Sequence, residues 1–268
     1  MAVTANSLTA GGDGTDSSSY TTASISPGAN RLVLVTVVSR AAVPSVVPTL
    51  SGGGMGTWTQ VGTREVDFSG TSSDARVTLF RALEVSPGSG TITIDFGGTT
   101  QRGSSWTVDE FSGVDASGVN GSAAVVQSNT NSDNTGLSSF TVVLGTFSSD
   151  GNATYGSLAL LKTSGATIAV PTEGSGFTAL GGNNSNTAPG TGIRSEFRSD
   201  NDTTVDASVA TAQNGWIGAA VEIKTAEAPS VSPSVSPSVS PSVSPSQSPS
   251  ISPSVSPSVS PSESPSVS

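Results

Sequence analysis

From Pro229 to Ser268, proline occupies every fourth position and serine every second position, which repeats the tetrapeptide Pro-Ser-Val-Ser. Proline at this spacing excludes an α-helix, because each ring removes a backbone donor and clashes with the carbonyl group four residues earlier. The missing N–H groups also exclude a central β-strand. We therefore predict that residues 227–268 form an extended tail, either polyproline-II-like or disordered.

Two interpretations of this tail stay open. The first is a bare Ser/Pro spacer, and the second is an O-glycosylated stalk, since tracts rich in serine and proline carry such glycans. Glu263 is the one charged residue of the repeat Pro229–Ser268, so a sugar coat would supply solubility that charge does not. The candidate glycosylation positions are Ser230, Ser232, Pro233, Ser234, Ser236, Pro237, Ser238, Ser240 and Pro241.

The chain before the tail is patterned as short strands. Arg31–Arg40 is the clearest, because its β-branched run is bounded by Pro and Gly residues. The predicted strands are 31–40, 57–68, 75–84, 91–96, 104–112, 123–127, 139–147, 153–162, 192–198, 204–210 and 215–224. Clusters of Gly, Asn, Asp and Ser separate them, including 181–186. We predict an all-β fold, an antiparallel sandwich of jelly-roll type over residues 20–226, preceded by a flexible polar arm at 1–19.

Composition removes several classes of function. The chain has no histidine and no cysteine, so Ser-His-Asp triads, thiolate chemistry and ordinary zinc sites are impossible. Its net charge of −10 argues against nucleic acid and against anionic membranes as partners. No run is long and apolar enough to span a bilayer.

Carboxylates are the remaining acid–base groups. Asp109 and Glu110 are neighbours in a predicted strand, so their side chains face opposite ways and form no dyad. Glu65 and Asp67 share one face of a predicted strand. Glu196 and Asp206 lie on different predicted strands, which cross-strand pairing could bring together. Carboxylates at a suitable separation can cleave glycosides, but charge that solubilises outer strand faces explains these residues as well. We predict no enzyme.

Calcium is the one cofactor that the sequence offers. Residues 11–16 match the start of a calcium-binding Gly-Gly-x-Gly-x-Asp repeat once, and Asp200 and Asp202 supply clustered oxygen atoms, as do Asp150 and Asn152. These are also ordinary turn residues, because Asn and Asp hydrogen-bond their own backbone. We favour turns, and the expected cofactor is none.

Three tryptophans, Trp58, Trp106 and Trp216, are the candidate ligand contacts, together with Asp200 and Asp202. An exposed indole ring would stack on a sugar. Each tryptophan, however, has apolar neighbours two positions away in a strand pattern, which favours a place in the core.

Several segments resemble segments of known proteins. They are Ser26–Val35, Gly56–Val61, Trp106–Asp115 and 201–208 leading into Gly215–Ile223. They resemble uncharacterised β-sandwich modules of tailed-phage structural proteins and bacterial surface proteins. The tail resembles Ser/Pro tetrapeptide tails from the same setting and the backbones of glycan-coated extracellular fibrils. The resemblance implies a virion or surface component and no active-site residues.

Three hypotheses follow. The first is a non-enzymatic structural or adhesion protein of a virion or extracellular surface, with a β-sandwich head on the tail. The alternatives are a carbohydrate-binding module and a subunit of a glycan-coated fibril in which the repeat is the working part. The expected partners are the protein itself, other virion or surface proteins, or glycans. Because no signal peptide is visible at the start, we expect synthesis in a cytosol.

Overall fold

The computed structural model describes residues 2–41, 45–68, 74–163, 167–185 and 189–227. The tail from 228 onward, with every candidate glycosylation position, lies outside the described residues. Within the described ranges the chain forms sixteen β-strands and no helix, and none of the described segments could cross a membrane as a helix. All strand pairs are antiparallel, so the predicted all-β antiparallel class is confirmed.

The strands fall into two sets of eight. The first set is β1 Thr4–Asp13, β2 Ser19–Thr21, β3 Arg31–Ala41, β4 Thr49–Gly52, β5 Thr59–Val66, β6 Asp74–Glu84, β7 Ile92–Asp95 and β8 Gly103–Ser112. The second set is β9 Val125–Asp133, β10 Ser139–Val143, β11 Ala153–Lys162, β12 Thr172–Glu173, β13 Thr178–Ser185, β14 Gly190–Arg198, β15 Thr204–Ser208 and β16 Gly215–Ile223.

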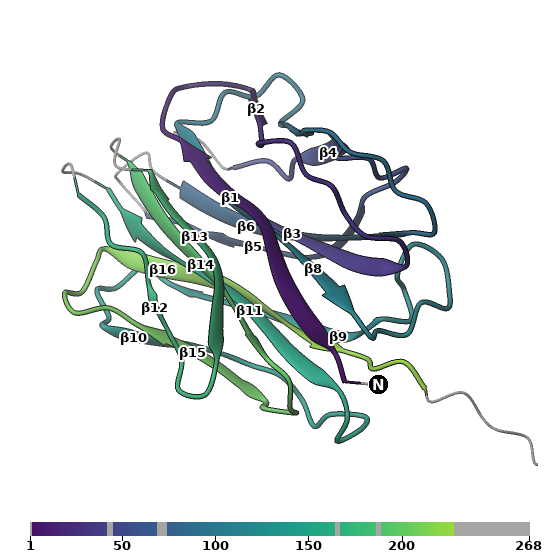
Figure 1. The fold of residues 1–268 in the computed structure, drawn as a ribbon. Coiled ribbons are helices and arrows are strands. Elements are labelled where there is room, and N and C mark those ends of the chain that lie inside the picture. The colour runs from purple at the N-terminus through teal and green to yellow at the C-terminus, as the bar shows by residue number, and fades with distance from the viewer. Residues whose placement is uncertain (1, 42–44, 69–73, 164–166, 186–188, 228–268) are drawn as a thin grey trace, which may run out of the picture. The chain divides into compact units, whose positions relative to one another are not determined.

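Both sets have the same topology. The first makes a five-stranded sheet in the order β1-β8-β3-β6-β5 and a three-stranded sheet in the order β2-β7-β4. The second makes the sheets β9-β16-β11-β14-β13 and β10-β15-β12, which is the same order with eight added to each strand number. The head is therefore an internal duplication of one eight-stranded sandwich, a repeat that we did not predict from the sequence (Figure 1).

The two five-stranded sheets pack face to face between the two three-stranded sheets. Strand β1 lies against β13 and β5 against β9, while β8 faces β14 and β6 faces β16. Exchanging the two sets leaves this list of contacts unchanged, so the two sandwiches meet as the subunits of a symmetric homodimer do, about a pseudo-two-fold axis. The interface between them is thus contributed by equivalent strands of both repeats.

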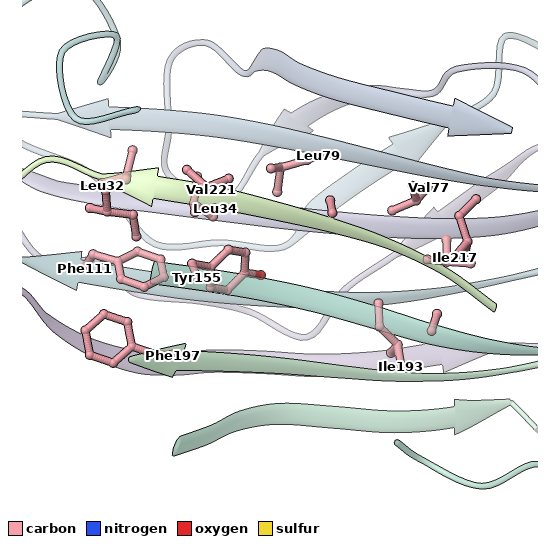
Figure 2. Close-up of a cluster of buried hydrophobic side chains, with 14 of the residues drawn as sticks. Leu32, Leu34, Val77, Leu79, Phe111, Tyr155, Ile193, Phe197, Ile217 and Val221 are labelled. Atoms are coloured by element: carbon pink, nitrogen blue, oxygen red, sulfur yellow. The ribbon is translucent and has the colours of Figure 1, made fainter. Parts of the chain in front are cut away.

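Alternating side chains of the central strands fill this interface, which we call the shared core (Figure 2). Its buried members come from both repeats, including Leu32, Leu34, Leu79 and Phe111 from the first and Tyr155 from the second. The ring centroids of Phe111 and Tyr155 lie 5.3 Å apart in an edge-to-face contact. Burying such large apolar groups is the main favourable term in folding, and here it also joins the two sandwiches.

The opposite faces of the same strands form a separate core in each repeat. In the first repeat Val33, Val35 and Trp106 pack against the three-stranded sheet through Ile92 and Ile94. In the second repeat Leu158, Leu160 and Trp216 do the same against β10 and β15. The central strands are therefore buried on both faces, which explains why β3 reads as a continuous apolar run rather than as an alternating one.

The predicted flexible arm at 1–19 is wrong, because Thr4–Asp13 is strand β1 and pairs with β8 along its length. Two glycines of β1 are needed where this strand packs closely against side chains of other strands. A Cβ on Gly11 would lie 2.8 Å from the ring of Trp106, and a Cβ on Gly12 would lie 2.8 Å from Asn183 Oδ1. The sequence of β1 therefore reads as a loop although its backbone is in a sheet.

The predicted turn at 181–186 is likewise wrong over the residues described, since Thr178–Ser185 is strand β13 at the edge of its sheet. Gly181 lies against β1, where a Cβ would come within 2.9 Å of Ser7 Oγ. The two edge strands approach so closely that only glycine fits here. Glycine has a low β propensity, so the sequence does not predict a strand.

Candidate functional site

The site that joins the head to the tail lies at the end of the last strand. Strand β16 occupies an inner position, paired with β11 on one side and β9 on the other, and every residue of it is buried. Lys224 and Thr225 follow Ile223 directly and precede the tail by a few residues. We call this segment and its contacts the tail anchorage.

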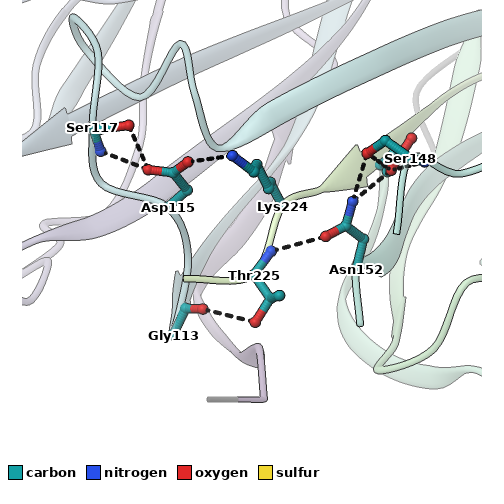
Figure 3. A network of polar contacts seen from close by, with 8 residues as sticks. Gly113, Asp115, Ser117, Ser148, Asn152, Lys224 and Thr225 are labelled. Atoms are coloured by element: carbon teal, nitrogen blue, oxygen red, sulfur yellow. Dashed lines mark hydrogen bonds and ion pairs between the residues drawn. The ribbon is translucent and has the colours of Figure 1, made fainter. Parts of the chain in front are cut away.

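Contacts to the first repeat hold the tail anchorage in place (Figure 3). Lys224 Nζ lies 2.8 Å from Asp115 Oδ2, and Ala226 N donates to Gly113 O at 2.7 Å. Thr225 forms an isolated antiparallel bridge with Val114. The strand that carries the tail is thus connected to both sandwiches, because its end pairs with the segment that follows β8.

Within the second repeat, Glu222 closes the other side of the anchorage. This fully buried carboxylate accepts hydrogen bonds from Asn152 Nδ2 at 2.6 Å and from Ser148 N and Oγ, both at 2.9 Å. Gln127 Nε2, directly across on β9, donates to its other oxygen at 2.6 Å. Asn152 Oδ1 in turn accepts from Thr225 N at 3.1 Å, so the Glu222 network extends to within two residues of the tail.

The first repeat contains an equivalent network around Glu110. This carboxylate accepts from Arg31 Nη1 at 2.6 Å, from Gly28 N at 3.0 Å and, more weakly, from Asn6 on the neighbouring strand β1 at 3.4 Å. Arg31 and Asn152 occupy matching positions, each preceding the residue that pairs with Phe111 or its counterpart in β16. The duplication therefore extends to a buried glutamate that fixes the loop before each central strand.

Electrostatics keep the anchorage charged. A hydrogen bond from the Lys224 ammonium, together with those from Ser117, lowers the pKa of Asp115 to about 2. Burial alone would raise the pKa of Glu222, but hydrogen bonds from Asn152, Gln127 and Ser148 outweigh it and hold this pKa below its usual value. Both carboxylates thus stay ionised and keep their partners at neutral pH.

The tryptophans do not form a binding surface. Trp106 and Trp216 are buried, at 5% and 4% exposure, and Trp216 stacks on Phe140 with ring centroids 5.4 Å apart. The prediction of a ligand contact is wrong for these two residues, and the core interpretation is confirmed. Trp58 is half-buried, packs against the first repeat's own core and donates Nε1–H to Gly52 O at 3.2 Å.

Asp200 and Asp202 are brought together by an arginine. Arg198 Nε lies 2.5 Å from Asp200 Oδ1, Arg198 Nη1 lies 2.6 Å from Asp202 Oδ2, and the guanidinium rests 5.9 Å from the ring centroid of Phe177. Both carboxylates are thereby paired with a cation of the protein itself. Asp202 also caps its own turn through Thr204 N, and no group of three metal-ligating side chains occurs among the described residues.

The acid–base candidates are separated or buried. Asp109 faces the shared core and Glu110 faces the loop network, opposite ways as predicted. Glu65 is paired with Arg76 at 2.7 Å. Glu196 is fully buried, and burial, aided by the nearby charge of Asp206, raises its pKa to about 8, although a hydrogen bond from Gly174 N lowers it in part.

The tail anchorage was not found from the sequence. Its one visible signal is the glutamate in an otherwise apolar strand, at the sixth position after Trp216 in β16. A charged residue between Val221 and Ile223 needs a buried set of donors, and those donors come from segments 70 to 95 residues away. Comparison with known proteins adds nothing to this picture, since no family model, curated protein or solved structure matches the chain.

Proposed function

We propose that this chain is a non-enzymatic structural or adhesion protein of a virion or an extracellular surface. The duplicated β-sandwich is its head, and residues 227–268 are an extended stalk that serine- or proline-linked glycans coat. The head would make the specific contacts, with copies of itself, with other surface proteins or with glycans, while the stalk sets its distance from the particle.

The observation that carries this proposal is the way the chain leaves the head. A tail that merely trails from a domain needs no more than an exposed last residue. Here the last strand is an inner one, and the residues after it bond to both repeats through Asp115, Gly113 and Asn152. Tension on the tail along β16 would act on its hydrogen bonds to β9 and β11 together rather than one after another.

The topology supports the same class of protein. We assign each repeat to the jelly-roll type, because strands β1, β8, β3 and β6 of the first lie in one sheet and β2, β7 and β4 in the other. Sandwiches of this type serve widely as rigid carriers of surface loops. The absence of histidine and cysteine and the burial of Glu196 and Asp109 support a non-catalytic role.

Labelling of native material tests this function. Antibody fragments against the head and against the repeat should both decorate the surface of the particle or cell in electron micrographs, with pre-immune fragments as the control. Mass mapping of residues 227–268 from the same material should show a large excess over the sequence mass. Labelling confined to the cell interior would refute the proposal, and ordered filaments labelled along their length by the repeat antibody would favour the fibril subunit instead.

A pulling experiment tests the anchorage itself. Because the chain has no cysteine, a single one can be introduced as a handle at Thr100, before β8 at the end of the head away from the tail, or at Val119, near the tail anchorage. Pulling between Thr100→Cys and the end of the tail should require the larger force, since it loads β16 along its axis. Equal forces for Thr100→Cys and Val119→Cys would contradict a mechanical role.

A further inference from the structure

A polar groove lies between the two repeats where strands β5 and β9 run side by side. Its volume is about 530 Å³, and its walls include Arg64, Asp67, Ser132, Asp133, Asn134 and Thr135. Such a volume falls within the range of sites for small organic ligands. The groove lies at the end where β16 begins, since Asp133 pairs with Trp216, whereas the tail leaves from the opposite end of that strand.

The pseudo-two-fold symmetry places an equivalent seam between β13 and β1, and the two seams differ in how closely their strands approach. Gly181 there comes so near to β1 that a Cβ would lie 2.9 Å from Ser7 Oγ and 3.2 Å from Ala10 Cβ. On the β5 side a Cβ on Gly62 would reach its nearest neighbour, Thr130 Cγ2, only at 3.5 Å. The seam between β13 and β1 is therefore the more tightly packed of the two at this pair of glycines, and the seam between β5 and β9 carries the polar groove.

The walls of the open groove are already ordered. Arg64 donates Nε–H to Ser132 Oγ at 2.7 Å, which fixes its exposed guanidinium across the seam. Asn134 donates Nδ2–H to Asp67 O at 3.0 Å, which leaves its amide oxygen as an acceptor. Asp133 Oδ1 accepts from Thr135 N and Oγ1, both at 2.6 Å, which fixes the orientation of this carboxylate at the wall of the groove.

The donors and acceptors of the groove select the ligand class. An anion would meet the carboxylates of Glu65, Asp67 and Asp133, and a cation would meet the guanidinium of Arg64. A hydroxyl group can accept from a guanidinium and donate to a carboxylate at once, so a vicinal diol matches both walls. We propose that the groove between β5 and β9 binds a neutral polyhydroxylated ligand, a saccharide, through Arg64, Asp67 and Asn134.

This assignment rests on the proposed function, in which the head makes the specific contacts. It differs from a tryptophan-based carbohydrate module, because two of the three indole rings are buried and none lines the groove. Recognition here depends on charge-assisted hydrogen bonds to hydroxyl groups. Its specificity would therefore follow the stereochemistry of the hydroxyls rather than the apolar face of the sugar ring.

The test uses the full chain on an array of neutral plant, bacterial and animal oligosaccharides, with heparin and polylysine as the anionic and cationic probes. We expect binding of at least one neutral glycan, with an affinity that does not change as sodium chloride is added, because the ligand is uncharged. Arg64→Gln and Asp67→Asn should each weaken this binding by roughly tenfold or more. Arg102→Gln and Asp16→Asn, which change the same residue types outside the groove, should bind as the parent does.

Other results overturn the assignment. These are failure of every neutral glycan to bind, tighter and salt-dependent binding of heparin or polylysine, or undiminished binding by both groove variants with unchanged urea midpoints. If labelling places head and tail on the particle surface while the array stays blank, the saccharide assignment fails and the structural function stands. Binding on the array without surface labelling gives the reverse conclusion.

Discussion

Replacing Asp109 by asparagine should make the head more stable, and increasingly so as the pH rises. Asp109 lies on β8 in the shared core with no exposed surface, and its Oδ2 accepts a hydrogen bond from Tyr155 OH of the other repeat at 3.1 Å. Burial raises the pKa of this carboxyl from 3.8 to about 7, and the nearby hydroxyls of Ser195, Tyr155 and Ser7 offset only part of that effect.

The direction and size of this pH effect follow from the linkage between protonation and folding. A carboxyl whose pKa is higher in the folded state contributes stability below its unfolded pKa and loses it as the pH rises through the folded pKa. With pKa values of 3.8 unfolded and about 7 folded, the loss is roughly 1.5–2 kcal/mol at pH 5 and roughly 4 kcal/mol at pH 8.5. The asparagine variant loses nothing, so the difference between the two proteins should grow by roughly 2.5 kcal/mol over this range.

The assay is urea unfolding of parent and Asp109→Asn at several pH values from 5 to 8.5. The informative quantity is the change with pH in the difference between the two unfolding free energies. Any packing effect of the amide is the same at every pH and therefore cancels. Glu196, whose pKa is raised to about 8 chiefly by burial, titrates in both proteins and cancels as well. Asp16→Asn, at an exposed position, serves as the matched control and should track the parent.

A constant difference across the pH range would refute the reasoning. It would mean that Asp109 is already ionised in the folded head at pH 5 and that the shared core is wetter than its packing indicates. Growth well beyond roughly 2.5 kcal/mol would instead mean that Asp109 stays neutral in the folded head at pH 8.5.

Substitutions at three further positions test the packing. Glu222→Ala should lower the free energy of unfolding by about 2–4 kcal/mol, because it leaves buried donors without an acceptor, while Glu222→Gln should lower it less. Urea unfolding measures both variants, and a Glu222→Ala midpoint equal to that of the parent would contradict the network. Gly156→Ala should lower the melting temperature, since the new Cβ would lie 2.1 Å from Val205 Cγ1 and overpacking costs about 1–3 kcal/mol. Trp216→Ala should cost about 3–5 kcal/mol in urea, and an unchanged midpoint would place this indole outside the core.

The all-β class was predictable because β propensity and burial agree along the central strands. Arg31–Ala41 and Ala153–Lys162 carry branched and apolar side chains on both faces, and both are strands as predicted. Their ends fall near glycine- and proline-rich segments, whose turn chemistry is local and readable. Where local preference and tertiary environment favour the same structure, the sequence is a sufficient guide.

Prediction failed where tertiary contact selected the residues against their local preference. Gly12 of β1 and Gly181 of β13 are required by close approach between these two edge strands, and Gly11 is required by the ring of Trp106 on β8; all three contacts join residues more than ninety positions apart. Strands β2 and β12 are too short to show a period at all.

The duplication escaped notice for a related reason. Equivalent positions can share a role without sharing an amino acid. Arg31 and Asn152, for example, both donate a hydrogen bond to the buried glutamate of their own repeat. The open groove was equally hidden, because its two walls come from strands that are unconnected in sequence and meet only when the repeats pack.

The pairing of first and last strands within each repeat also shapes how the head folds. Thr4 pairs with Ser112 in the first repeat, and Val125 pairs with Ile223 in the second, so each five-stranded sheet is closed by segments about a hundred residues apart. Pairings this distant must pay the entropy of closing long loops before they gain contacts, which slows folding. Neither sandwich can bury its inner face until the other is formed, and the head should therefore fold late, slowly and in one cooperative step.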